Sequence, residues 1–148
     1  MLLDDGRIGL IDLGAGHAAT PDLCRGYARL RGASLECARD AQREAALAMG
    51  ILVESDPEAA SEAVLDLVSL VTEPFRHEGP YDFGASDIPT RAREGSLGLM
   101  TKHGFLRPPP PEMLFLQRKL GGTFLVCSRL RAKVDARALI EGALDGAA

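Results

Sequence analysis

The apolar residues of this chain recur at three- and four-residue steps from about residue 20 onward, which is the spacing of buried faces on α-helices. One clear example follows Ser34, which we expect to cap a helix that runs to Met49. Its predicted buried face consists of Leu35, Ala38, Ala41, Ala45, Ala48 and Met49. Because only 5% of the residues are aromatic, small aliphatic side chains must fill the core, and this also favours helices.

A second helix start is predicted by the run Ser-Asp-Pro-Glu at residues 55–58. Either Asp56 caps the helix with Pro57 in its first turn, or Ser55 and Glu58 form a capping box. The predicted buried face of this helix consists of Ala60, Ala63, Val64, Leu67, Val68 and Val71.

Shorter helices are predicted near the two ends of the helical region. The first covers about 20–31, with Thr20 or Asp22 as its cap. The last begins after Asp135, which can cap it, and covers about 135–144.

Prolines and glycines divide the second half of the chain. They interrupt the periodicity over 73–89, so we expect an irregular connection there, with a helix resuming near Thr90. Four prolines at 108–111 end any preceding helix, and a long helix is predicted over about 112–131. The glycine pair at 121–122 costs that helix about 1 kcal/mol per residue relative to alanine, which suggests a kink or the close approach of another helix.

The first 14 residues follow a strand pattern instead. Asp5-Gly6 suits a tight turn with positive φ, and strand-forming residues follow it at 8–11. The first strand is so short that we expect further structure before it. The sequence therefore predicts one mainly α domain, with a short N-terminal β-hairpin over 1–14 followed by a helical bundle over 20–148.

Composition excludes several classes of protein. The formal net charge of −4 and 26% charged residues are ordinary for a globular protein and argue against a nucleic-acid partner. The three cysteines, Cys24, Cys37 and Cys127, are far apart in the sequence and predict neither disulfides nor a zinc site. Acidic residues at 4–5 do not fit a secretory signal, and charged residues interrupt the most apolar windows, so a cytoplasmic setting is expected.

The segment that most strongly indicates a chemical function is Asp-Gly-Arg-Ile-Gly-Leu-Ile-Asp-Leu-Gly at residues 5–14. In it, Asp12 ends a predicted strand and is followed by an apolar residue and a glycine. Kinases use this arrangement to hold the Mg²⁺ that bridges nucleotide phosphates. The tripeptide alone is weak support, because strands often end in acidic turns.

The flanking residues make the segment similar to the ABC1/ADCK/UbiB (AarF-like) family of atypical kinases, whose hairpin reads close to Asp-Gly-Arg-x-x-Leu-Ile-Asp-Phe-Gly. Two later segments also resemble that family: Asp-Pro-Glu-Ala at 56–59 and Pro-Pro-Glu-Met-Leu-Phe-Leu-Gln-Arg-Lys-Leu-Gly-Gly at 110–122. The resemblance covers most of the chain and is strongest over 1–16 and 108–131.

The resemblance implies that Asp12 is a Mg²⁺ ligand and that residues 1–148 correspond to the later part of a kinase-like C-lobe. It also implies that the complete protein binds ATP and Mg²⁺, acts as an ATPase or transferase, and is linked to ubiquinone biosynthesis. The family's catalytic loop, Asp-x-His-Pro-Gly-Asn, and its N-lobe segments belong upstream of Met1. We therefore expect this fragment to be inactive alone and to bind neither ATP nor Mg²⁺ tightly.

The alternative function is a stand-alone helical interaction module that keeps the hairpin only as structure. The expected partners are a missing upstream kinase half or a second copy of the chain, held through hairpin residues Leu2, Leu3, Ile8 and Leu10. The resemblance also implies quinone-biosynthesis proteins near a membrane as partners, with the chain peripheral to that membrane.

Overall fold

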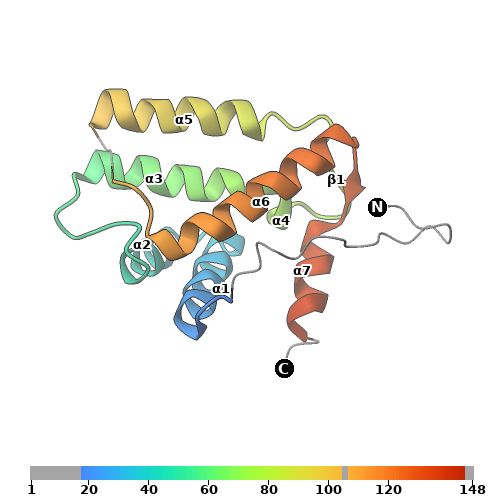
Figure 1. The fold of residues 1–148 in the computed structure, drawn as a ribbon, viewed down its shortest axis with the longest axis horizontal. Helices are drawn as coiled ribbons and strands as arrows, with labels where there is room; N and C mark the ends of the chain where they lie inside the picture. The colour runs from blue at the N-terminus through green and yellow to red at the C-terminus, as the bar shows by residue number, and fades with distance from the viewer. Residues whose placement is uncertain (1–17, 105–106, 146–148) are drawn as a thin grey trace.

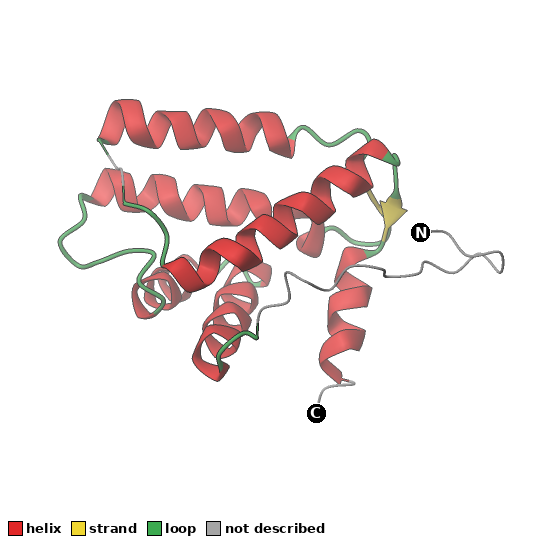
Figure 2. Ribbon diagram, viewed as in Figure 1, coloured by secondary structure: helices red, strands yellow, loops and turns green. Residues whose placement is uncertain are grey.

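The structure of this chain, a computed structural model, describes residues 18–104 and 107–145. Within these ranges it contains seven helices and one two-stranded antiparallel sheet (Figures 1 and 2). The predicted mainly α fold is confirmed. The predicted hairpin over 1–14, including Asp12, lies outside the described residues.

Helix α1 (Pro21–Leu35) begins as predicted but continues past the predicted end. The Thr20 hydroxyl caps it by accepting a hydrogen bond from the Leu23 amide at 3.3 Å. The prediction that Ser34 caps the next helix is wrong. Ser34 lies inside α1, fully buried, and its hydroxyl donates to the carbonyl of Leu30 at 2.7 Å, so the side chain satisfies itself within its own helix.

Helix α2 (Arg39–Ala48) packs against both α1 and α3, and its buried face differs from the predicted one. Ala41, which we expected to be buried, is exposed. The buried residues are Gln42, Ala45 and Ala46. The difference is explained by an ion pair with α3. Arg39 of α2 donates from Nε to the carboxylate of Glu62 on α3 at 2.9 Å, and this contact fixes the rotation of α2 about its axis.

Helix α3 (Glu58–Val71) starts at the predicted place without either predicted cap. The residue before it is Pro57, and no side chain accepts a hydrogen bond from its first turn. The carboxylate of Asp56 instead accepts from the Val53 amide at 2.8 Å and pairs with Arg107. Asp56 therefore fixes the loop before the helix rather than the helix itself.

The first core cluster lies where α2 and α3 meet helix α5 (Ile88–His103), which runs beside α3 (Figure 1). Its buried members are Ala46, Leu52, Val64, Leu65 and Leu99. The predicted face of α3 was partly wrong, since Val71 is 51% exposed. Gly95 allows close packing of α5 on α3, because a Cβ there would lie 2.7 Å from Leu67 Cδ2.

The segment predicted to be irregular contains helix α4 (Glu73–Arg76) and strand β1 (Tyr81–Asp82). Strand β1 pairs with β2 (Lys133–Val134) in antiparallel register, with Tyr81 opposite Val134 and Asp82 opposite Lys133. This sheet joins parts of the chain about fifty residues apart and differs from the predicted N-terminal hairpin. A second core cluster of Tyr81, Phe83, Ile88 and Ala136 packs beside it.

Helices α6 (Pro111–Arg129) and α7 (Ala136–Asp145) match their predicted positions. Asp135 caps α7 as predicted, with its carboxylate accepting from the Ala138 amide at 2.9 Å. Helix α6 crosses the bundle diagonally in Figure 1. Of the two explanations for Gly121-Gly122, a kink or the close approach of another helix, no helix among the described residues provides the second, because a Cβ at either position would meet no described atom within 4 Å. Among the described helices, none is long and apolar enough to cross a membrane.

Candidate functional site

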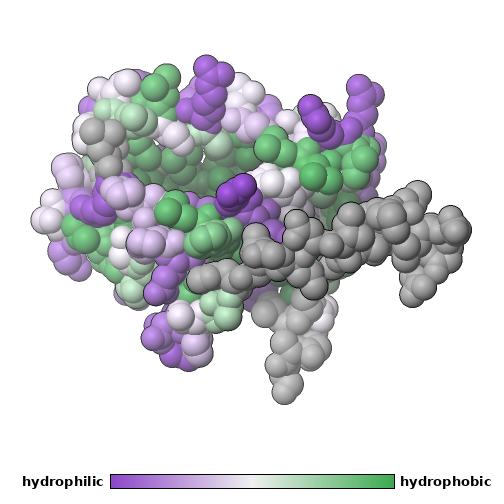
Figure 3. All heavy atoms as spheres, in the orientation of Figure 1, coloured by the Kyte–Doolittle hydropathy of each residue, from purple (hydrophilic) through white to green (hydrophobic). Residues whose placement is uncertain are grey.

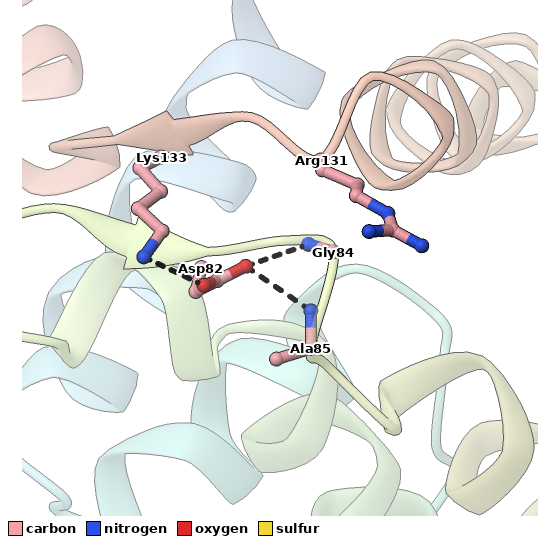
Figure 4. A pocket seen from close by; sticks show the side chains of 5 residues that line it. All are labelled: Asp82, Gly84, Ala85, Arg131 and Lys133. Carbon is pink, nitrogen blue, oxygen red and sulfur yellow. Dashed lines mark hydrogen bonds and ion pairs between the residues drawn. The ribbon is translucent and has the colours of Figure 1, made fainter.

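A small hollow lies where the two strands of the sheet meet the end of α6 (Figure 4). Its volume is about 260 Å³. The residues that line it are Asp82, Gly84, Ala85, Arg131 and Lys133. It brings charged residues from two distant segments together, and this makes it a candidate site in the described part of the chain.

Asp82 is the only carboxylate among the lining residues, and its oxygens are occupied. Oδ1 accepts from the amides of Gly84 and Ala85 at 3.0 and 3.1 Å, and Oδ2 lies 3.1 Å from Lys133 Nζ. The hydrogen bond from Lys133, helped by the two amides, holds the pKa of Asp82 below its ordinary value. A carboxylate kept ionised and engaged in this way stabilises a turn and is poorly suited to act as a general base.

Arg131 forms the opposite wall, and its backbone explains the close packing. Helix α6 ends in a Schellman motif, in which Arg131 N donates to Ser128 O at 3.0 Å and Ala132 N donates to Cys127 O at 2.9 Å. Arg131 has φ +50°, a conformation that usually favours glycine. Gly84 lies directly against it, because a Cβ on Gly84 would be 2.8 Å from Arg131 Cβ.

A polar network next to this hollow connects α4, β1 and α5. The Tyr81 hydroxyl lies 2.8 Å from a Glu73 carboxylate oxygen and 2.7 Å from the Ser86 hydroxyl. The other Glu73 oxygen accepts from Arg91 Nη2 at 2.7 Å, and Arg91 Nε donates to Asp87 at the same distance. Burial raises the pKa of Tyr81, so this phenol stays protonated at neutral pH. The network is therefore structural in character.

A larger hollow of about 400 Å³ lies between α1, α2 and the start of α6. Its floor contains the methionines Met49 and Met113, of which Met113 is 2% exposed. Its rim carries Asp22, Arg25, Arg29 and Glu112. Asp22 and Arg25 pair with each other, so the rim is internally neutralised. The hollow offers apolar surface with a charged edge, without a nucleophile among its lining residues.

The described residues do not assemble a metal site. Within 18–104 and 107–145, no group of three or more histidine, cysteine, aspartate or glutamate side chains could hold an ion. Asp12, the predicted Mg²⁺ ligand, lies outside these ranges, so its surroundings are not described. The described residues therefore supply no magnesium site of their own.

Comparison with known proteins gives the decisive observation. No family model matches the chain. Over 135 residues, or 91% of its length, the chain is 33% identical to rat (Rattus norvegicus) "Atypical kinase COQ8B, mitochondrial". It is 30% identical over 93% of its length to "Atypical kinase COQ8, mitochondrial" of Schizosaccharomyces pombe, and 31% identical over 91% to its Saccharomyces cerevisiae counterpart.

The chain belongs to the ABC1/ADCK/UbiB family of atypical kinases. This confirms the resemblance inferred from the hairpin motif and from the helix that follows the prolines. The match is consistent with the C-terminal portion of the family's proteins. The chain spans about a quarter of the length of these relatives: 25% of the rat protein, 23% of the S. pombe protein and 27% of the S. cerevisiae protein.

Sequence reasoning missed one segment that imitates the kinase motif. Residues 82–84 read Asp-Phe-Gly, the same acid-apolar-glycine pattern as Asp12-Leu13-Gly14. Here the aspartate is the last residue of strand β1, and its carboxylate is held by Lys133 and two backbone amides. The signal available in the sequence was the Asp-x-Gly turn itself, and the geometry shows that such a turn can be purely structural.

Proposed function

We propose that this chain is the C-terminal part of an ABC1/UbiB-type atypical kinase or ATPase that acts in ubiquinone biosynthesis. The observation that carries the proposal is the 33% identity to an atypical kinase over 91% of the chain, together with the nearly continuous hairpin motif at residues 5–14. The relatives that support it are named as mitochondrial kinases. Phosphoryl transfer and its link to quinones are proposed for the whole protein.

Asp12 is the residue proposed to contribute to the chemistry. In the complete protein it would hold Mg²⁺, which supplies charge stabilisation to the nucleotide phosphates when it is bound. The described residues of this chain would contribute a packed helical lobe to the complete protein. They offer no second carboxylate cluster that could take over the metal.

Phosphoryl transfer depends on several positioned groups, so we expect the 148-residue chain alone to show no ATP turnover. Restoring in-frame upstream sequence that carries an Asp-x-His-Pro-Gly-Asn segment should restore it. In that longer form Asp12→Asn should abolish turnover, while in the short chain it should change the free energy of unfolding by about 0.5 kcal/mol or less. Magnesium-dependent ATPase assays and thermal melts provide the two measurements.

Two results would contradict this proposal. Turnover by the purified short chain that disappears in Asp12→Asn would show that the missing segments are unnecessary. Unfolding of the short chain by Asp12→Asn would show that Asp12 is a structural cap rather than a ligand kept for a metal.

A second candidate is an interaction module without catalysis, and one observation favours it. Helix α6 exposes large apolar side chains along most of its length, including Leu114, Leu120, Leu125 and Val126, each 47% to 58% exposed. The proposed partners remain an upstream kinase half, a second copy of the chain, or quinone-biosynthesis proteins at a membrane surface. Assaying the chain for binding without turnover separates this candidate from the first.

A further inference from the structure

Arg31 differs from the other arginines of α1 in its surroundings. Arg25 and Arg29 are exposed, and Figure 3 shows hydrophilic residues at the lower edge of the molecule, where α1 lies. Arg31 is half-buried, and its Nε and Nη1 atoms are shielded from solvent. Neither atom has a hydrogen-bond partner in the part of the chain that the structure describes. Two buried donors of one cation are therefore unused.

An unpaired buried guanidinium is unfavourable. Arginine keeps its charge in a protein, so it cannot become neutral on burial as a lysine can. Removing this charge from water costs free energy, and hydrogen bonds to an opposite charge normally offset that cost. Buried donors in folded proteins are nearly always paired for this reason. The two unused donors of Arg31 therefore point to a partner beyond the described residues.

Tyr27 lies on the same face of α1 as Arg31. Residues four positions apart in a helix are neighbours one turn from each other on its surface. Tyr27 is also half-buried, and burial raises the pKa of its phenol, which stays protonated at neutral pH. Its hydroxyl has no hydrogen-bond partner among the described residues. This face of α1 thus offers a phenol donor beside the guanidinium donors.

The acidic residues of the neighbouring helices do not pair with this face. Helix α1 packs against α2 and α4. Glu73 on α4 is held in the network around Tyr81. Asp40 and Glu44 on α2 are exposed, and within 18–104 and 107–145 neither bonds to the buried nitrogens of Arg31. The described helices therefore provide the donors without an acceptor.

The donors define the chemistry of the partner. A guanidinium and a protonated phenol donate hydrogen bonds, and an ionised carboxylate or phosphate group supplies both acceptor oxygens and negative charge. Because Arg31 as a whole is partly exposed, an ion can reach the group from solvent. We propose that Tyr27 and Arg31 bind one oxyanion, a carboxylate or a phosphate group, at the side of α1. The proposal depends neither on Asp12 nor on phosphoryl transfer.

NMR spectroscopy of the isotope-labelled 148-residue chain tests the site, because arginine Nε–H groups and backbone amides give separate signals. Sodium phosphate and sodium acetate are titrated separately against sodium chloride at constant ionic strength. The Nε–H signal of Arg31, identified by its absence from Arg31→Lys, should move to a plateau. The expected dissociation constant is about 1 mM, as for a small ion held by a few hydrogen bonds.

Three variants separate specific binding from general attraction, with the backbone amides of α1 as the signals that are followed. Arg31→Lys keeps the charge without the planar fork of donors and should raise the dissociation constant about tenfold or more. Tyr27→Phe removes one donor and should raise it about three- to tenfold. The matched control is Arg29→Met, an exposed arginine of the same helix, which should leave it within about twofold.

Thermal melts give a second and independent measurement. Arg31→Met removes the charge, and in chloride it should melt at the same temperature as the parent or higher, because an unpaired buried charge is lost. Phosphate also stabilises proteins generally, through its exclusion from their surfaces. The parent should therefore gain more in melting temperature than Arg31→Met between chloride and phosphate, since only the parent also gains from binding.

Three outcomes overturn the proposal. An Arg31 signal that does not move to a plateau with either anion, up to about 50 mM, shows that no such site exists. Equal affinities of the parent and Arg31→Lys show attraction to any positive charge. Equal gains in melting temperature for the parent and Arg31→Met show exclusion effects alone. When the site is present, a plateau at lower concentration with acetate assigns it to a carboxylate, and one with phosphate assigns it to a phosphate group.

Discussion

Arg107 binds Asp56 with both ends of its guanidinium group: Nη1 lies 2.8 Å from Oδ2 and Nη2 lies 2.6 Å from Oδ1. The Asp56 side chain is only 5% exposed, and its Oδ2 also accepts from the Val53 amide. The pair joins the loop before α3 to the segment after α5. Because α3 and α5 pack against each other at the first core cluster, this ion pair holds the two helices together at one end.

The pair predicts a specific loss of stability in acid. The hydrogen bonds from Arg107 hold the pKa of Asp56 below its ordinary value of 3.8. A lowered folded-state pKa contributes stability that is present above the unfolded value and is lost as pH falls through the folded value. Asp56→Asn should therefore cost about 1 kcal/mol at pH 7, after allowing for solvent screening at Arg107, and the cost should shrink below about pH 4.

Urea unfolding of both proteins between pH 7 and pH 2 measures this difference. The informative quantity is the difference in stability between the parent and Asp56→Asn at each pH. Glu62 and Asp82 also have lowered pKa values, so their protonation in acid destabilises both proteins equally. A destabilisation that is equal at pH 7 and pH 3 would mean that Asp56 acts through shape rather than charge.

Gly84 gives a prediction about packing. A Cβ there would lie 2.8 Å from Arg131 Cβ and 2.9 Å from Arg131 Cα, and the latter is backbone that cannot rotate away. Gly84→Ala should separate β1 from the end of α6 and cost about 1–3 kcal/mol in free energy of unfolding. The matched control is Gly98→Ala in α5, where nothing described lies within 4 Å, and it should stabilise the chain by about 0.5–1 kcal/mol. Equal effects in thermal melts would refute the packing explanation.

Local signals predicted most helices correctly. Thr20 and Asp135 cap the helices that follow them, and α6 begins in the proline run, because these features depend on neighbouring residues alone. Ser34 and Asp56 were misassigned for a different reason. Each has an alternative partner, the Leu30 carbonyl for Ser34 and Arg107 for Asp56, and a local pattern cannot decide between competing partners.

The sheet could not be predicted by the same reasoning. Strands β1 and β2 have two residues each and lie about fifty residues apart, so neither shows a strand period, and their pairing depends on the tertiary fold. The hollow beside Asp82 depends on that pairing and was missed with it. For the predicted metal site the situation is reversed: Asp12 was found from its flanking motif, and the family is confirmed, while its role stays a prediction.

Replacing the strained residue at the end of α1 should increase the stability of the chain. Cys37 occupies the left-handed position of a Schellman motif with φ +53°, and Ala38 N donates to Ala33 O at 2.9 Å. Glycine adopts this conformation without a steric cost, so Cys37→Gly should stabilise the chain by about 0.5–1 kcal/mol. Cys37→Ala has the same strain as cysteine and should melt within about 0.5 kcal/mol of the parent. Stabilisation by both variants would point to the thiol rather than to the backbone.

The Tyr81 hydroxyl should contribute measurably to stability, because it joins Glu73 on α4 to Ser86 before α5 from a residue that is only 8% exposed. Tyr81→Phe keeps the ring contact with Phe83 at 5.0 Å but leaves two half-buried partners without this hydroxyl, so we expect a cost of about 1 kcal/mol. The control is Tyr27→Phe, because the only other tyrosine has no hydrogen-bond partner among the described residues and should change stability by less than about 0.5 kcal/mol. Chemical unfolding of both variants makes the comparison. If the two variants lose the same stability, the network around Glu73 does not hold α4 and α5 together.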